Sequence, residues 1–343
     1  MKERYASQLF EYANSIFLWG FEQQKLIKQQ TGKSYKTIVT GHPRFELLKP
    51  EFHFLYNQEV KNITKRYGRF ILVNTNMGFG NNIKGDDFII ANYGNRFENI
   101  KKIVKFDKVK VKAYLELIIE LSKKIDKKII LRPHPEENHD LYLNAFKDID
   151  NTEVIYDGSV VPWLLAADEV IHPDCTTAIE ASFLGKLPIS YMPKNYPEDI
   201  VTKIPLEISA RFNHIFEVFD YLMNKKKRID NEHTRYKALE GYFSHSLPTC
   251  QLIINKLKEI EQVSASNDDN KTLWRQFMTL RIKESFNSLR RNDELDFVRK
   301  KLQGFDYDNI QKIQNILFDN DGLAKVSVKQ HSNRLFLFEK SKY

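Results

Sequence analysis

The segment His172–Tyr191 carries side chains suited to binding an anion. Its pattern predicts the end of a buried strand, a polar turn, a helix that begins with hydroxyl groups, and a second buried strand. Asp174, Thr176 and Thr177 lie where that helix begins, and free N–H groups and the helix dipole attract anions there. Glu180 follows one turn later on the same face, where its carboxylate can hold ribose hydroxyls. The pattern is typical of a nucleoside diphosphate site in an open α/β sheet, although Thr and Asp also occur there purely as helix caps.

A second strand end with polar side chains precedes this segment. The hydrophobic run 129–131 is followed by Arg132 and, after a proline, by His134. Both motifs are expected at the carboxyl edge of one parallel sheet, which is where open α/β folds bind ligands. Two such strand ends favour a binding site over capping alone. His134 can instead be a structural imidazole, and His172 can either orient the turn or contact a ligand.

Two further strand ends complete the predicted site. The buried strand 70–73 ends in Asn74 and Asn76, and a loop rich in Gly and Asn follows that is long enough to be functional. These asparagines either shape the loop or touch the substrate. The turn at Gly158 and Ser159 follows another short strand.

Buried strands alternate regularly with helices in the middle of the chain. The expected strands span 70–73, 128–132, 153–156, 169–172 and 187–191, and the expected helices span 109–126, 139–147, 161–167 and 175–185. This alternation predicts a mostly parallel sheet with helices on both faces. Because parallel crossovers are right-handed, a doubly wound α/β layout follows.

The two flanks differ from this central region. Upstream, residues 4–30 are expected to form an amphipathic helix and residues 36–40 a short strand. Downstream, the pattern predicts helices at 214–225, 233–244 and 247–263, a polar linker at 264–270, helices at 271–290, 293–302 and 308–318, and a weak hairpin over 324–329 and 334–338.

Composition argues against several classes of protein. The 343 residues are 42% apolar, which is enough for the core of one or two domains. Cys175 and Cys250 have no spacing of a disulfide scaffold or zinc site, and they suit a reducing cytoplasm. No apolar stretch reaches the roughly 20 residues of a membrane helix, so we expect any membrane contact to be peripheral. No phosphate-loop or dinucleotide fingerprint follows strand 70–73, which counts against nucleotide hydrolases and dehydrogenases.

The net charge of +8 comes largely from lysine-rich runs such as 123–128 and 225–228. Such runs are usually solvated helix faces, and the functional alternative is attraction to an anionic membrane or to phosphorylated substrates. The positive charge is the single feature that favours nucleic-acid binding. Aromatic residues do not alternate with basic ones as base stacking requires. We therefore expect no nucleic-acid partner.

Three motifs, taken in order, resemble a known family. Thr40–Leu48, with the sequence TGHPRFELL, precedes the strand end at 132–135 and the block at 172–188. Together they are similar to bacterial surface-carbohydrate (capsular polysaccharide) biosynthesis proteins, which are glycosyltransferase-like proteins of the GT-B fold. That family is distantly related to CDP-glycerol glycerophosphotransferases and to capsule sialyl- and Kdo-transferases. The resemblance covers about residues 10–200, and the block at 172–188 is its most specific part.

The resemblance implies a role for each motif. Thr176 and Thr177 would hold the phosphate of a nucleotide-sugar donor, and Glu180 would hold its ribose. Arg132 and His134 would act as the catalytic groups beside the phosphate or leaving group. Cys175 stands where related turns often carry Ser or Gly. The other residues expected to bind substrate are His172, Asp174, Cys175, Gly158, Ser159, Asn74 and Asn76.

The resemblance also implies a domain plan with a GT-B-like, Rossmann-type donor domain at 68–200. The family's acceptor domain should precede Thr40, where this chain holds about 40 residues, so we expect a truncated N-terminal half. Residues 1–67 would be the end of that domain and the interdomain junction. Residues 201–263 would be a helical closing segment, and 271–343 a helical extension.

The resulting hypothesis is a glycosyltransferase that uses a cytidine or uridine nucleotide-sugar and a polysaccharide or lipid-linked acceptor in surface polysaccharide biosynthesis. It would work in the cytoplasm at the inner face of the membrane. The GT-B class needs no metal-binding Asp-x-Asp motif, so no cofactor or metal is expected. Two alternatives stay open: a CDP-glycerol-type glycerophosphotransferase, and a truncated paralogue that binds nucleotide-sugar without turnover.

Overall fold

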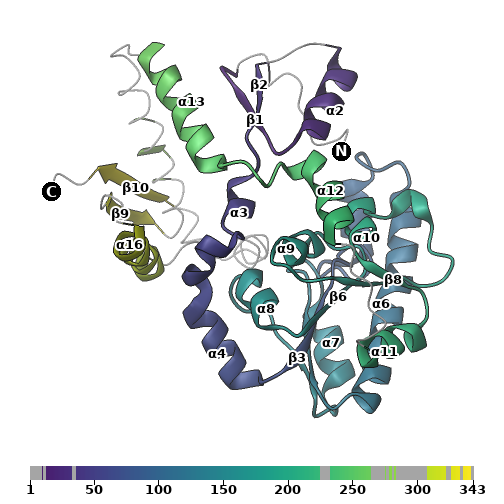
Figure 1. Ribbon diagram of the computed structural model, residues 1–343. Helices are drawn as coiled ribbons and strands as arrows, with labels where there is room; N and C mark the ends of the chain where they lie inside the picture. Colours follow the sequence, from purple (N-terminus) through teal and green to yellow (C-terminus); the bar gives the residue numbers. More distant parts are fainter. Residues whose placement is uncertain are drawn as a thin grey trace. The chain divides into compact units, whose positions relative to one another are not determined.

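The computed structural model describes residues 13–32, 36–224, 232–263, 307–321, 326–332 and 335–340, together with a few isolated positions (Figure 1). The chain divides into two compact units, residues 1–258 and 259–343. The first unit contains the predicted site and is described first.

A six-stranded parallel sheet forms the centre of the first unit. Its strands are β3 (Phe70–Asn74), β4 (Lys128–Arg132), β5 (Thr152–Val154), β6 (Glu169–His172), β7 (Ile189–Tyr191) and β8 (Ala210–Phe212). They pair in the order β5-β4-β3-β6-β7-β8. The five central strands expected from the hydrophobic runs are confirmed, with shifts of one or two residues at their ends. The sixth strand, β8, has only three residues and none of them is buried, so its hydrophobic signal was too weak to predict it.

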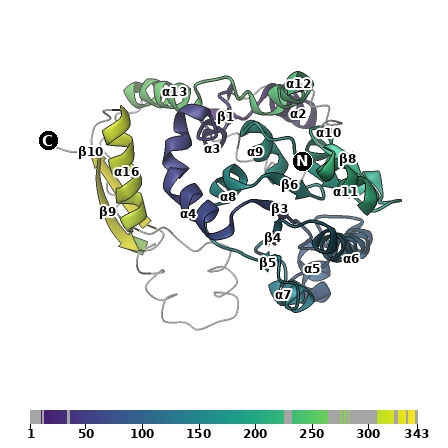
Figure 2. The same ribbon diagram turned by 60° about the horizontal axis from the view of Figure 1, so that its bottom comes forward.

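Helices cover both faces of this sheet, as the predicted doubly wound α/β fold requires. On one face α6 (Ile100–Lys124), α7 (His139–Phe146) and α11 (Ile215–Met223) pack on Ile71 and Val73. On the other face α4 (Asn57–Tyr67), α8 (Val160–Ala166) and α9 (Thr177–Phe183) lie close to Phe70 and Leu72. Figure 2 shows α8 and α9 on one side of β3 and β4, and α6 and α7 on the other. Successive residues of β3 therefore enter opposite cores, because side chains alternate along a strand.

The strand order decides where a ligand can bind. From β3 the chain first builds outward through β4 to β5, then returns to the other side of β3 and builds outward through β6, β7 and β8. The order reverses between β3 and β6, which pair in parallel with Val73 opposite Ile171. In doubly wound sheets the loops diverge at this point and leave a crevice at the carboxyl ends of the strands.

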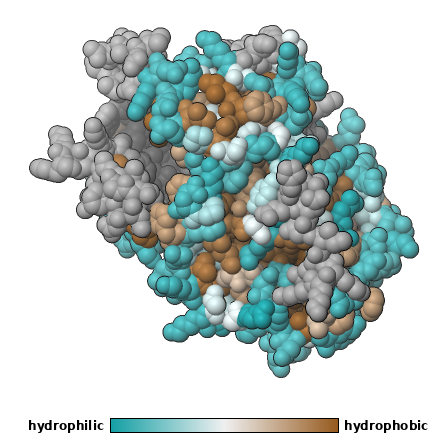
Figure 3. All heavy atoms as spheres, in the orientation of Figure 1, coloured by the Kyte–Doolittle hydropathy of each residue, from teal (hydrophilic) through white to brown (hydrophobic). Residues whose placement is uncertain are grey.

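The N-terminal part of this unit corrects one prediction. Residues 16–18 form strand β1 (Ile16–Leu18) instead of the middle of a helix, and α2 (Phe21–Thr31) begins only afterwards. Strand β1 pairs in parallel with β2 (Thr37–Val39). The short helices α3 (Pro43–Glu46) and η2 (Pro50–Tyr56) then lead to α4. Apolar residues gather over the β1–β2 region at the top of the space-filling view (Figure 3).

The remaining elements of the first unit are three short helices that were not predicted, followed by two helices that were. These are α5 (Gly85–Tyr93), η3 (Glu198–Ile200), α10 (Lys203–Glu207), α12 (Glu232–Phe243) and the start of α13 (Thr249–Val263). The second unit contains α16 (Tyr307–Asp321) and the antiparallel hairpin of β9 (Val326–Ser332) and β10 (Leu335–Lys340), which confirms the expected helix and hairpin. The predicted linker at 264–270 and the helices at 271–290 and 293–302 lie outside the continuously described residues, as do 225–228.

The lysine-rich run at 123–128 forms ordinary surface ion pairs. Each ammonium nitrogen lies close to a carboxylate oxygen. The Nζ–O distances are 2.7 Å for Lys123 and Glu120, 2.6 Å for Lys127 and Asp168, and 2.7 Å for Lys128 and Glu153. This run is therefore a solvated face. None of the helices in the described part of the chain combines the length and apolar character needed to cross a membrane.

Candidate functional site

Three of the predicted strand ends meet where the strand order reverses. Asn74 ends β3, Arg132 ends β4 and His172 ends β6. Because these strands are neighbours in the order β4-β3-β6, the loops that follow them line one edge of the sheet. The structure thus brings together the motifs at 74–76, 132–134 and 172–177, which lie up to about a hundred residues apart in the sequence.

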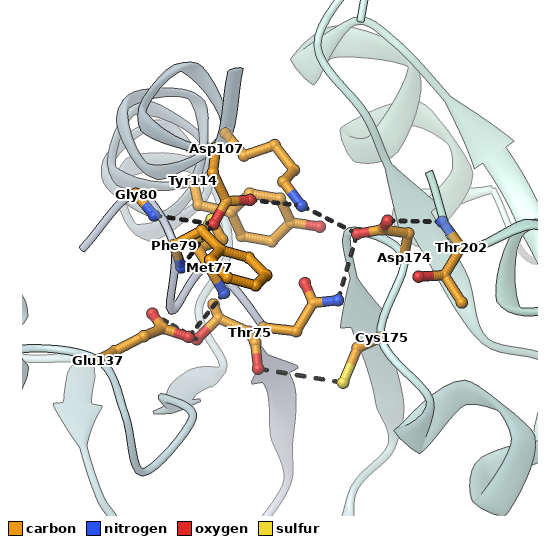
Figure 4. Close-up of polar contacts among 12 residues, drawn as sticks. Thr75, Met77, Phe79, Gly80, Asp107, Tyr114, Glu137, Asp174, Cys175 and Thr202 are labelled. Carbon is orange, nitrogen blue, oxygen red and sulfur yellow. Dashed lines mark hydrogen bonds and ion pairs between the residues drawn. The ribbon is translucent and has the colours of Figure 1, made fainter. Parts of the chain in front are cut away.

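A buried ion network lies where the strand order reverses, and Figure 4 labels its two carboxylates, Asp107 and Asp174. Nζ of Lys110 lies 2.7 Å from Oδ1 of Asp107 and 3.1 Å from Oδ1 of Asp174, so one lysine of α6 bridges two carboxylates. Burial alone would lower the pKa of Lys110, but Asp107 and Asp174 together raise it above its usual value. The lysine is therefore charged, and it ties α6 to the loop after β6.

Asp174 is fully engaged within the protein. Besides Lys110, its carboxylate accepts hydrogen bonds from Nδ2 of Asn76 at 3.3 Å and from the backbone N–H of Thr202 at 2.9 Å. Burial opposes ionisation of Asp174, but the Lys110 ammonium and these donors hold its pKa below the usual value. The predicted substrate contact of Asp174 stays a prediction, and the observed contacts fasten three segments around the crevice.

Asp107 fixes the loop that follows β3. Its Oδ2 accepts hydrogen bonds from the backbone N–H groups of Phe79 and Gly80, at 3.1 and 2.9 Å. A Cβ on Gly80 would lie 2.4 Å from the carbonyl carbon of Asp107, so only glycine permits this approach. The Gly/Asn-rich loop singled out in the sequence is thus held against α6.

A second buried carboxylate, Glu137, joins the loop after β3 to the loop after β4. It accepts hydrogen bonds from Oγ1 of Thr75 at 2.9 Å, from the N–H of Met77 at 2.9 Å and from the N–H of His134 at 3.2 Å. The hydroxyl of Tyr142 also donates to it. Complete burial raises the pKa of Glu137 to about 7, although these donors oppose the rise.

His172 orients the turn before α9. Its Nδ1 accepts a hydrogen bond from the N–H of Cys175 at 3.2 Å, so Nε2 carries the ring proton and faces Oγ of Ser209 at 2.8 Å. Burial lowers the pKa of His172 to about 4. Both nitrogens of this neutral ring are engaged, which favours the orienting role over direct contact with a ligand.

The start of α9 contains the two predicted phosphate-binding threonines. Thr176 is exposed at the cap position, while Oγ1 of Thr177 donates to Sγ of buried Cys175 at 3.2 Å. Glu180 is buried one turn later and forms an ion pair with Arg44 of α3. The carboxylate expected to hold ribose therefore also joins α9 to the segment that carries the Thr40–Leu48 motif.

Arg132 and the turn at 157–159 are joined directly. The guanidinium donates to the carbonyl oxygens of Asp157 at 2.6 Å and Gly158 at 3.1 Å, and it lies 5.0 Å from the centre of the Trp163 ring. Burial lowers its pKa to about 10. Ser159 caps α8 by accepting from the N–H of Val161 at 3.5 Å. Arg132 thus shapes the turn, and a contact of its guanidinium with phosphate stays a prediction.

His134 is half-buried beside the glycine loop. Its Nδ1 accepts from the N–H of Glu136 at 3.3 Å, and a Cβ on Gly78 would lie 3.8 Å from that nitrogen. Its carbonyl oxygen lies 3.2 Å from Nε2 of His139. The ring therefore lies where the loops after β3 and β4 meet.

Two asparagines at the end of β3 have polar atoms without partners. Asn74 is 3% exposed, and its Nδ2 has no hydrogen-bond partner among the residues that the structure describes. The same holds in that part of the chain for Oδ1 of Asn76. Among the described residues, these two unsatisfied atoms lie at or just after the end of β3, beside the point where the strand order reverses.

Sequence reasoning missed Asp107, Lys110 and Glu137. A signal for two of them was present, because Asp107 and Lys110 follow an apolar stripe of α6 that contains Val104, Val111 and Tyr114. Charged residues on a buried helix face are rarely left unpaired. Their partner Asp174 is distant in sequence, so only the fold identifies it.

A hollow of about 380 Å³ adjoins the crevice at the carboxyl ends of β7 and β8. The loop after β7, η3 and α10 enclose it, and its lining includes Lys194, Lys203, Arg211 and Tyr196. Within the described residues, no three His, Cys, Asp or Glu side chains gather as a metal site would require.

Comparison with known proteins gives only distant structural similarity. No protein-family model and no curated protein matches the sequence. The wall teichoic acid polymerase TagF is 14% identical, with a TM-score of 0.44 over 76% of this chain and 60% of the TagF chain. HepE of Anabaena in complex with UDP is 11% identical, with a TM-score of 0.39 over 76% of this chain and 70% of that chain. This chain thus matches only about 60% of the TagF structure, and similarity at this level assigns no role to its residues.

Proposed function

We propose that the first unit binds a nucleotide-sugar at the crevice between β3 and β6 and serves a glycosyltransferase reaction. The observation that carries this proposal is the pair of unpartnered amide atoms at the end of β3, Nδ2 of Asn74 and Oδ1 of Asn76. Leaving a buried polar group unpaired costs about 1–3 kcal/mol. A ligand with both anionic oxygens and hydroxyl groups would satisfy the donor and the acceptor together.

The proposed reaction needs groups that stabilise the negative charge gained by the leaving group. Oriented backbone N–H groups stabilise such charge without reorganisation, and the exposed Thr176 marks the start of α9 at this edge. Half-buried His134, on the loop after β4, is the side chain we assign to the leaving phosphate. Losing one oriented donor of this kind typically lowers the rate by about 10²–10³.

The finer proposal concerns the pathway and the place of action. From the order of the three sequence motifs, we assign the protein to bacterial surface polysaccharide biosynthesis, with a uridine or cytidine donor and a polysaccharide or lipid-linked acceptor. The net charge of +8 supports a cytoplasmic protein drawn to the anionic inner face of the membrane.

Calorimetry with CMP, CDP, UDP and ADP tests donor binding. A pyrimidine nucleotide should bind, and Asn74→Ala should weaken it about tenfold, because a charge-assisted hydrogen bond contributes about 1.5–3 kcal/mol. Thermal unfolding of the variant is measured in parallel, because Asn74 is 3% exposed and a cavity left by its truncation can lower stability without affecting binding. Exposed Asn92 on α5 offers a matched control, and Asn92→Ala should leave binding unchanged. The proposal fails if no nucleotide binds the folded protein at millimolar concentration.

Sedimentation with lipid vesicles tests the membrane proposal. The protein should sediment with anionic vesicles at low salt and should not bind neutral vesicles. It should be released as salt rises, because salt screens the attraction between exposed basic side chains and anionic lipid. Equal binding to neutral vesicles would contradict it.

A further inference from the structure

Glu137 lies fully buried between the loops that follow β3 and β4, and its carboxylate accepts hydrogen bonds from four donors. The Thr75 hydroxyl and the Met77 N–H donate from the loop after β3 (Figure 4). The His134 N–H donates from the loop after β4, and the Tyr142 hydroxyl donates from α7. An ionised carboxylate has about four lone-pair sites, so these donors saturate it.

Backbone hydrogen bonds join the same two loops on either side of Glu137. The N–H of Asn138 donates to the carbonyl oxygen of Asn81 at 2.8 Å, and the N–H of Ile83 donates to that of Glu136 at 3.0 Å. The side chain of Glu137 therefore lies at the centre of this junction, where a change in its hydrogen bonding acts on both loops.

Glu137 anchors residues beside the proposed nucleotide site without reaching the crevice itself. Thr75 and Met77 are the neighbours of Asn76, whose Oδ1 has no hydrogen-bond partner among the described residues. His134 carries the imidazole assigned to the leaving phosphate, and its N–H is one of the four donors. Because the Glu137 side chain has no exposed surface, it can act on a ligand only through these neighbours.

No lysine, arginine or histidine side chain forms an ion pair with Glu137 within the part of the chain that the structure describes. Burial raises the pKa of Glu137 to about 7, so the carboxylate gains and loses its proton in the neutral range. Burial and the Glu137 carboxylate both raise the pKa of Tyr142, which therefore stays a hydrogen-bond donor. The other titratable groups around the junction are His134 and Glu136 on its own loop, His139 of α7 and Asp107 of α6.

We propose that Glu137 is a positioning residue of the nucleotide site, and that its ionised form alone holds the two loops in the arrangement that binds a nucleotide. Protonation turns one acceptor site into a donor, so the four donors no longer find four acceptor sites and at least one buried group loses its partner. The inference rests on the proposed function, because it takes the loops of Asn76 and His134 as parts of the nucleotide site.

Calorimetry with nucleotide diesters between about pH 6 and about pH 8 tests this on the full chain. UDP-glucose and CDP-glycerol suit the measurement, because neither has the terminal phosphate of UDP or CMP, whose second ionisation falls near pH 6. The ionised fraction of Glu137 rises from about a tenth to about nine tenths over this range, and apparent affinity scales with the competent fraction. The wild type should therefore bind about tenfold more tightly at the higher pH.

Variants assign this pH dependence to Glu137. Glu137→Gln cannot ionise, so its dissociation constant relative to that of the wild type should grow about tenfold across the same range. This ratio cancels the titration of His134, which both proteins share. Glu98→Gln, which changes an exposed carboxylate just before α6, is the matched control and should keep the wild-type profile.

Tyr142→Phe should move the profile instead of removing it. The ionised Glu137 loses one donor in this variant, so its pKa rises and the gain in affinity should shift to higher pH. A residue that only stabilises the fold would not shift the midpoint of a binding profile. This variant therefore decides the question even if Glu137→Gln fails to fold.

Growth of the ratio together with the upward shift supports the inference. A ratio that stays constant with pH, or a Tyr142→Phe profile with the wild-type midpoint, would overturn it and leave the nucleotide site standing. Failure of both diesters to bind the folded protein at any pH would remove the proposed function and this inference together.

Discussion

Two charged regions lie side by side at the carboxyl edge of the sheet, and they use their charges in opposite ways. At the base of the crevice, Lys110, Asp107 and Asp174 are buried and bound to one another. In the neighbouring hollow, Lys203 and Arg211 are exposed and form no ion pair in the described part of the chain. Burial thus turns charges at this edge into structural contacts, whereas the exposed charges around the hollow stay solvated.

The largest expected effect comes from breaking the buried network. Lys110→Met leaves two carboxylates buried without a counter-ion, and removing one partner of a buried pair typically destabilises a protein by about 3–5 kcal/mol. Urea denaturation measures this loss. Lys112→Met is the matched control on the same helix. The Lys112 side chain is 81% exposed, and its ion pair with Glu116 is long, with 3.9 Å between Nζ and Oε1. A loss below about 1 kcal/mol for Lys110→Met would contradict the structural role.

The second effect concerns Glu137 and pH. Its pKa rises from 4.5 to about 7 on folding, so the folded state holds a proton that the unfolded state has released between these values. Its contribution to stability is complete below about pH 4.5 and declines as pH rises through 7, by on the order of 3 kcal/mol.

The neutral imidazole of His172 gives the opposite slope, because its pKa falls from 6.5 to about 4 and the unfolded state takes up the proton as pH falls. The contribution of Glu137 is therefore measured as the difference in the free energy of unfolding between the wild type and a Glu137 variant at each pH. The stability of the wild type relative to Glu137→Gln should decrease as pH rises from 4.5 to 7, while Glu59→Gln, on the exposed side of α4, should show no such trend. A constant difference across this range would disprove the assignment.

A smaller effect is expected from Arg132. Replacing it by Met leaves the carbonyl oxygens of Asp157 and Gly158 without their donor and should destabilise the fold by about 2 kcal/mol. Arg69→Gln removes a 70% exposed partner of Asp168 and should cost less than about 0.5 kcal/mol. Thermal unfolding compares the two, and equal values would show that Arg132 is no more than a surface cation.

The smallest effect sharpens the contrast with the hollow. Lys203→Gln should change the free energy of unfolding by less than about 0.5 kcal/mol, since the side chain is exposed and has no ion pair among the described residues. Chemical denaturation measures it. A loss of 1 kcal/mol or more would place Lys203 with the structural charges instead.

Much of the central fold could be predicted because the signals are local. The runs at 70–73 and 128–132 are hydrophobic on both faces, as strands buried in a parallel sheet must be. Short elements were less predictable. Residues 16–18 seemed to continue a helix, and they become a strand only because residues 37–39 lie beside them. Strand β8 likewise depends on its pairing with β7 and not on its own side chains.

The sequence by itself determined which residues end the buried strands, and hence that Asn74, Arg132 and His172 face one edge of a sheet. Tertiary structure alone decided what those residues do. The order of the strands put the reversal between β3 and β6, and it set Asp174 against Lys110, which lies 64 positions away. The physical reason is that hydrophobic periodicity is a local property of the chain. Whether a charge is buried and paired depends instead on the partners that folding brings to it.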